Sequence, residues 1–365
     1  MKKLSTVAMI ATLVSASAFA GEHTINAVGR AGWTYLDNDY KKTGNSNSSS
    51  FNIDYLRTTF AGTVTPSVKY FLTTDFLTVN DSATSAKKDS VDGTSTFIDE
   101  AFLTKSFSTG TSIILGKKAV LIGGREYDYL NFDRYSTSYF FQATPANQVG
   151  LTLTQEIAGQ TLMAQYFNGN KDNGKGAGTN AQSKFGWSVG WNGSLLNGII
   201  KPIVAYTVIP EAGGTNGGAT SLSGVRDNKG NDNFMSAGLQ FNTPHDVVLE
   251  VDYDLLTEKY AVGTTAATKK DLKTTSLVGL VRYAGERFSP FAKYIADKRK
   301  TASVKTAQRS AYDVGVEFKE SKEDAFRYHV VYSGATVKES MNTTEVKSSP
   351  KSIMVGLKFD AAILK

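Results

Sequence analysis

The stretch from residue 247 to 255 reads Val247-Val248-Leu249-Glu250-Val251-Asp252-Tyr253-Asp254-Leu255. Successive side chains of an extended strand point to opposite faces. The odd positions therefore form an apolar face, and Glu250, Asp252 and Asp254 form a charged face. A strand with these two faces fits a sheet that has hydrocarbon on one side and water on the other.

The same period recurs along the chain. In residues 326–332, aromatic and valine side chains alternate with Arg327 and His329, and in residues 353–359 the apolar positions flank Lys358. This alternation predicts an all-β, transmembrane antiparallel barrel of about sixteen strands, an even number that brings both chain ends to one side of the membrane. The predicted strands span residues 24–36, 51–64, 68–79, 96–106, 111–119, 148–157, 160–168, 184–194, 198–209, 233–242, 246–258, 273–284, 287–298, 309–319, 325–336 and 350–359.

The connections between these strands alternate in length. Tight turns are predicted at residues 65–67, 242–244 and 284–286, and long polar stretches at residues 168–183 and 211–232. Short turns on the periplasmic side and long loops outside are typical of outer-membrane barrels.

Two features argue against parts of this assignment. Pro202 and Pro290 lie within predicted strands, where proline removes a hydrogen-bond donor from the sheet. Phe51 and Ile53 share a face with Arg57, which departs from strict alternation in the second predicted strand.

The first 20 residues have the features of an export signal. Lys2 and Lys3 precede an apolar stretch at residues 7–14, and Ala18-Phe19-Ala20 gives a small-x-small cleavage pattern. The apolar stretch is too short to span a bilayer, which disfavours a retained anchor. We therefore expect cleavage near Ala20, which leaves residues 21–365 as a single barrel domain exported to the outer membrane of a Gram-negative cell.

Composition excludes several classes of function. The chain has no cysteine, so disulfides and thiolate metal sites are excluded. A net charge of +6, scattered along the sequence, does not indicate nucleic-acid binding. With three histidines available as bases, we expect no enzyme activity, no metal and no cofactor. The mean hydropathy of −0.23 agrees with a membrane barrel, because only alternate residues meet lipid.

Several stretches resemble the general bacterial porins, and most closely the phosphate-selective porin O and P family. The first is Tyr55-Leu56-Arg57-Thr58-Thr59-Phe60-Ala61-Gly62-Thr63-Val64-Thr65-Pro66, continuing to Tyr70 and Thr74-Asp75-Phe76. The second is Ile98-Asp99-Glu100-Ala101-Phe102-Leu103, followed by Leu115-Gly116-Lys117. The resemblance implies a 16-stranded barrel, a homotrimer in contact with outer-membrane lipid, and a third external loop that folds into the pore.

Residues 119–147 are the candidate constriction loop. They carry the charged residues Arg125, Glu126, Asp128, Asp133 and Arg134 among seven tyrosine and phenylalanine side chains. Folded inward, the loop packs these rings against the wall and presents its charges to the channel. The alternative is an external loop that covers the trimer interface.

The inward positions of the predicted strands are not randomly charged. Six basic residues fall on one continuous arc of the wall: Arg30, Arg57, Lys69, Lys293, Arg327 and Lys358. The acidic residues Glu250, Asp252 and Asp254 lie elsewhere on the circumference. Our hypothesis is a transverse electric field across a narrow opening. The alternative is the mixture of charges that any water-filled lumen carries.

These features predict a water-filled channel for passive diffusion of small hydrophilic solutes and ions. One alternative is a channel that prefers anions or phosphate. Another is a structural or adhesive surface barrel with a plugged lumen. Conductance across a planar bilayer distinguishes an open channel from a plugged barrel.

Overall fold

The computed structural model describes residues 22–37, 47–77, 98–129, 133–145, 147–169, 185–210, 225–226, 231–261, 269–301, 306–321, 323–341 and 344–364. The predicted signal at residues 1–20 lies outside these ranges, as does most of the two long polar stretches. Within the ranges, no helix has the length and apolar character needed to cross a membrane.

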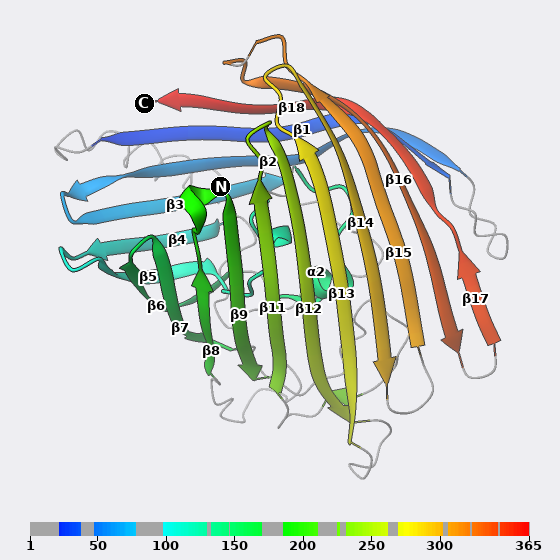
Figure 1. The fold of residues 1–365 in the computed structure, drawn as a ribbon, viewed down its shortest axis with the longest axis horizontal. Helices are drawn as coiled ribbons and strands as arrows, with labels where there is room; N and C mark the ends of the chain where they lie inside the picture. The colour runs from blue at the N-terminus through cyan, green and yellow to red at the C-terminus, as the bar shows by residue number, and fades with distance from the viewer. Residues whose placement is uncertain are drawn as a thin grey trace, which may run out of the picture.

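Sixteen long strands in the described part of the chain form one closed antiparallel barrel (Figure 1). They are β1 (His23–Asp37), β2 (Ser48–Thr65), β3 (Val68–Leu77), β4 (Ile98–Ser106), β5 (Thr111–Ala119), β6 (Asn147–Ile157), β7 (Gln160–Asn168), β8 (Phe185–Asn192), β9 (Ile200–Pro210), β11 (Asn231–Asn242), β12 (Val247–Ala261), β13 (Lys269–Tyr283), β14 (Phe288–Thr301), β15 (Thr306–Phe318), β16 (Phe326–Met341) and β18 (Lys351–Leu364). The barrel closes because β1 pairs with β18.

Shorter elements complete the fold. The two-residue strand β10 (Val225–Arg226) pairs with β12, and β17 (Thr344–Ser348) extends β16 as a hairpin. The short helices η1 (Arg125–Tyr127) and α2 (Tyr139–Ala143) belong to the segment between β5 and β6, and η3 (Leu196–Gly198) joins β8 to β9. Figure 1 shows α2 in front of the far wall, within the outline of the barrel.

The alternation in β12 separates two environments as the sequence predicts. Leu249, Val251 and Tyr253 are 41%, 52% and 48% exposed, whereas the carboxylates at the intervening positions are buried. In β16, Tyr328 and Val330 are exposed and His329 is buried. The exposed apolar face is the outside of the barrel, and the polar face lines its interior.

A β-bulge explains the irregular second strand. Ala31 of β1 pairs with Ile53 and Arg30 pairs with Tyr55, so Asp54 is the extra residue. A bulge shifts the faces of a strand by one position. Phe51 and Ile53 are therefore exposed on the outside, while Tyr55 and Arg57 point inward. The Asp54 carboxylate accepts a hydrogen bond from Arg30 at 3.2 Å.

Both prolines lie in strands, and the last strand is longer than predicted. Pro202 and Pro290 are each the third residue of their strand, where few ladder bonds are lost. The prediction that the final strand ends at Phe359 is wrong, because β18 continues to Leu364. The reason is that the first residues of β1 need a partner: Val28 pairs with Asp360, and Ile25 with Leu364.

Candidate functional site

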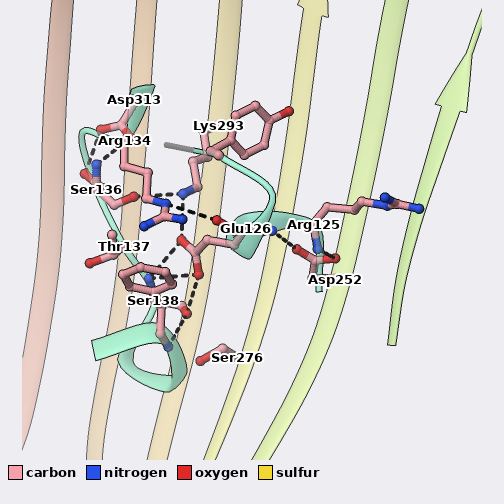
Figure 2. A network of polar contacts seen from close by, with 12 residues as sticks. Arg125, Glu126, Arg134, Ser136, Thr137, Ser138, Asp252, Ser276, Lys293 and Asp313 are labelled. Atoms are coloured by element: carbon pink, nitrogen blue, oxygen red, sulfur yellow. Dashed lines mark hydrogen bonds and ion pairs between the residues drawn. The ribbon is translucent and has the colours of Figure 1, made fainter. Parts of the chain in front are cut away.

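Residues 120–129 and 133–145, here called the inner segment, lie against the interior face of the barrel wall. At their start, the backbone amides of Arg125 and Glu126 donate to the two carboxylate oxygens of Asp252 at 2.6 and 2.8 Å (Figure 2). A carboxylate at the beginning of a helical turn satisfies amides that have no partner within the turn. Asp252 of β12 therefore fixes η1 to the wall.

Two glycines allow the inner segment to approach the wall closely. Gly123 and Gly124 have φ of 81° and 83°, a region that favours glycine. A Cβ atom on Gly123 would lie 2.8 Å from the Cβ of Ala205, and one on Gly124 would lie 2.9 Å from Ser236 Oγ. Any larger residue here would push the segment away from β9 and β11.

Glu126 joins the two halves of the inner segment to β14. Its carboxylate accepts a hydrogen bond from Ser138 Oγ at 2.6 Å and forms an ion pair with Lys293 Nζ at 2.7 Å (Figure 2). Ser138 in turn caps α2, because its hydroxyl accepts from the Phe141 amide at 3.0 Å. Glu126 is almost fully buried, so these partners take the place of water around its carboxylate.

Two further carboxylates of the wall bind backbone amides of the segment. Asp313 of β15 accepts from the Ser136 amide at 3.0 Å and from its hydroxyl at 2.6 Å. Asp297 of β14 accepts from the Tyr139 amide at 3.1 Å and is neutralised by Arg309. Together with Asp252, three strands thus hold the segment through main-chain atoms.

The segment also contacts the strands that close the barrel. Lys358 of β18 is fully buried, and its ammonium lies 3.0 Å from Asp133 and 2.5 Å from Glu317. Arg327 of β16 is 3.6 Å from Asp133 and 3.1 Å from Glu317. The ring of Tyr135 lies beside this ion-pair network, and its centroid is 4.8 Å from the Lys358 ammonium nitrogen.

Aromatic residues of the segment pack into an apolar part of the interior. Phe140 is fully buried in a cluster that lies against β7, β9, β11 and β12. Its ring is 5.7 Å from that of Phe234, and Tyr127 packs against the same cluster. Burial raises the pKa of the Tyr127 phenol well above its usual value, so this phenol stays neutral at neutral pH.

Two wall arginines, Arg30 and Arg57, lie near Arg134 where the segment passes β1 and β2. Arg30 donates to the backbone oxygen of Arg134 at 2.8 Å. Burial lowers the pKa of Arg134, Glu126 raises it, and the nearby Arg57 charge lowers it further. Arg57 forms ion pairs with Asp75, at 2.6 Å, and with Asp99.

The structure brings together most of the charged residues singled out by the sequence. Arg125 also pairs with Asp128 of the segment at 2.7 Å, and Tyr129 donates to Glu250 at 2.6 Å. Asp254 of β12 accepts from Ser236. Lys69 lies apart, exposed near the turn between β2 and β3, and joins none of these ion pairs.

Sequence reasoning missed six carboxylates of the interior. Four of them form ion pairs with the basic arc: Asp54, Asp75, Asp99 and Glu317. Asp297 pairs with Arg309 instead, and Asp313 binds Ser136. Inward position in the strand alternation is a signal that identifies Asp297, Asp313 and Glu317. It does not identify Asp54, which is a bulge residue, or Asp99, which lies at a register shift between β3 and β4.

A small pocket lies between the segment and the wall. Its lining includes Tyr129, Arg134 and Tyr135 from the segment, and Arg282, Phe291 and Asp313 from β13 to β15. Acidic and basic groups therefore line the same small space.

Comparison with known proteins agrees with this architecture. Residues 25–360 match the family described as phosphate-selective porin O and P. None of the curated proteins is a significant match to the chain.

Three solved structures share the fold. The trimer form of OmpT, an outer membrane protein of Vibrio cholerae, has a TM-score of 0.60 at 11% identity, covering 94% of this chain and 100% of that one. The anion-selective porin from Comamonas acidovorans has a TM-score of 0.60 at 11% identity, covering 93% and 100%. The outer membrane channel DcaP of Acinetobacter baumannii has a TM-score of 0.61 at 11% identity, covering 93% and 97%.

The closed barrel has an apolar outside and a charged interior. The family match runs from β1 to β18. This family and this fold are those of channels in the outer membrane rather than of enzymes. The chain therefore belongs to the phosphate-selective porin O and P family of outer-membrane porins.

Proposed function

We propose that the inner segment is the constriction of a channel through which small hydrophilic solutes and ions diffuse passively. The observation that carries the proposal is the set of wall carboxylates Asp252, Asp297 and Asp313, which bind the segment through its backbone amides. Because main-chain atoms are held, the segment is a fixed part of the lumen. Reconstitution into planar bilayers tests this: we expect stable open channels, whereas an electrically silent protein would support a structural or adhesive barrel.

The open path is proposed to run between the inner segment and the interior face of β2 to β6. The segment's contacts with Asp252, Asp297, Asp313 and Lys358 hold it toward the opposite side, β12 to β18. The face of β2 to β6 carries polar groups such as Arg57, which suit a water-filled passage.

A preference for anions is the second candidate, and the arginines of this region favour it. Arg30, Arg57 and Arg134 lie together where the segment approaches β1 and β2. Guanidinium groups match the geometry of phosphate and carboxylate oxygens. The family description and the anion-selective porin of Comamonas acidovorans point in the same direction. The nearby carboxylates reduce the preference for anions, so we propose a moderate selectivity for anions over cations.

Substituting Arg57 tests the role of these charges. In Arg57→Gln, the carboxylates Asp75 and Asp99 lose their counter-charge, so we expect the reversal potential in a salt gradient to shift toward cations. Asp99→Asn should shift it toward anions, because an acidic group is removed from the same place. Lys105→Gln is the matched control, since Lys105 lies at the opposite end of the strands, beside Ser67. Equal reversal potentials in all three variants would contradict the proposed path.

We also propose that the mature protein is a homotrimer that begins at Gly21. The trimer form of the Vibrio cholerae protein supports the assembly, and the cleavage pattern at residues 18–20 supports the mature start. The mass of the outer-membrane protein and of its detergent-solubilised assembly tests both statements. An intact N-terminus or a monomeric assembly would contradict them.

A further inference from the structure

Six exposed lysines gather on the outside of the barrel, at the end of the strands opposite the tight turns. We call this group the lysine belt; it consists of Lys273, Lys298, Lys300, Lys338, Lys347 and Lys351. Five of these lysines lie an even number of positions from an exposed apolar residue of their own strand, and so point outward like that residue. Lys347 pairs directly with Lys338 and therefore shares its face. The strands that carry them, from β13 to β18, stand side by side (Figure 1).

The sheet register places lysines directly opposite one another. Lys273 of β13 pairs with Lys300 of β14, and Lys338 of β16 pairs with Lys347 of β17. Gln308 of β15 lies between Lys298 and Lys338. Like charges directly opposite each other on adjacent strands destabilise a sheet. A counter-ion outside the protein would relieve this repulsion.

Protein groups supply only part of that counter-charge in the part of the chain that the structure describes. None of the six lysines forms an ion pair with a described residue. Three acidic residues occupy positions of the same face at this level: Asp37, opposite Lys351, Asp271, two positions before Lys273, and Glu345, two positions before Lys347. The connecting residues 262–268, 302–305 and 342–343 contain no aspartate or glutamate. The belt differs in this respect from the barrel interior, where nearly every basic residue named above has an acidic partner.

The position of the belt matches the outer edge of the membrane. Next to the belt, toward the middle of the strands, lie three exposed tyrosines on adjacent strands: Tyr294, Tyr312 and Tyr332. The ring centroids of the last two are 5.9 Å apart. Aromatic residues of this kind mark the boundary between hydrocarbon and headgroups. Lys298 lies ten positions beyond Phe288, at the other end of β14. A tilted strand needs about 9–11 residues to cross the hydrocarbon, so the ammonium groups reach the outer headgroups.

We propose that the lysine belt binds the phosphate groups of lipids in the outer leaflet. The six positive charges of the belt outnumber the three acidic residues at the same level, Asp37, Asp271 and Glu345, so the surface complements an anionic headgroup layer. Packing the belt against another subunit of the trimer would remove its uncompensated ammonium groups from water, which is costly. The proposal therefore assigns β13 to β18 to a lipid-facing side. It rests on the outer-membrane location and is independent of the proposed solute selectivity.

The test measures lipid binding by the trimer. The variant Lys298→Gln, Lys338→Gln, Lys347→Gln removes three charges of the belt. Native mass spectrometry would compare its binding of diphosphoryl lipid A with its binding of phosphatidylcholine. Each lysine near an anionic surface contributes about 1 kcal/mol. Removing three of them should therefore raise the dissociation constant for lipid A roughly 100-fold. Binding of phosphatidylcholine should not change.

The control removes three positive charges at the other end of the strands: Lys105→Gln, Arg287→Gln, Lys319→Gln. It should bind lipid A like the parent protein. Single-channel conductance should be the same in both triple variants, which separates lipid binding from channel function and shows that both barrels are folded. Equal affinity for lipid A in the two triple variants would overturn the proposal, as would a loss of phosphatidylcholine binding equal to that of lipid A.

Discussion

Replacing residues 125–142 by a short glycine-serine linker is expected to raise the single-channel conductance roughly two- to threefold, because the narrowest cross-section sets the conductance of a pore. The replaced residues include η1, four of the five residues of α2, the buried ring of Phe140 and the charges of Glu126 and Arg134. The wall carboxylates that they leave behind would face water, where an ionised group is well solvated. The measurement is conductance in planar bilayers, together with the size limit for neutral sugars in liposome swelling.

Two point variants complement the linker variant, one as an intermediate case and one as a control. Asp252→Ala removes the acceptor of two segment amides and should give noisy channels with conductance between those of the parent and the linker variant. Asp360→Ala removes a carboxylate of the same kind that binds Asn26 near the periplasmic end, and should leave conductance unchanged. Parental conductance in a correctly folded linker variant would show that the segment does not limit the pore.

Removing the ammonium of Lys358 is expected to cause the largest loss of stability. In Lys358→Met, the buried carboxylate of Glu317 and the partly buried one of Asp133 retain Arg327 as their shared cation. Breaking a buried ion pair by removing one partner costs about 3–5 kcal/mol, because the remaining charge is poorly solvated. The free energy of unfolding in urea, followed by the mobility of the heat-modifiable barrel on gels, measures the effect.

The control for this variant is Lys69→Met, which removes an exposed lysine at the turn between β2 and β3 and should change the urea midpoint little. The double variant Lys358→Met, Glu317→Gln restores the balance of charge and should recover most of the lost stability. If Lys358→Met unfolds at the same urea concentration as Lys69→Met, the buried network does not stabilise the barrel.

The sequence predicts the barrel well because the signal is local. In β12 and β16, each residue reports its own environment: Tyr253 and Val330 require hydrocarbon, whereas Asp252 and His329 cannot meet it. Strand number, closure and the position of the tight turns follow from this period and from turn residues such as Pro66.

The pairing of charges in the interior is less predictable. Arg57 meets Asp75 and Asp99 because of register shifts on both sides of β3, and Arg30 meets Asp54 because of a bulge. A register shift depends on how two strands fit together, so neither strand encodes it alone. The path of the inner segment depends likewise on distant groups, since Arg125 and Asp252 are 127 residues apart in the chain.

The contact between Asp133 and Lys358 has a consequence for the order of assembly. Asp133 belongs to the segment after the fifth strand, whereas Lys358 and Arg327 belong to the strands that complete the circle. The segment thus cannot be fully seated until β18 has paired with β1. In an incomplete barrel the inner segment would lack these contacts. The last pairing step therefore closes the wall and also fixes the width of the channel. A protein released from its insertion machinery before this step would form a leaky pore.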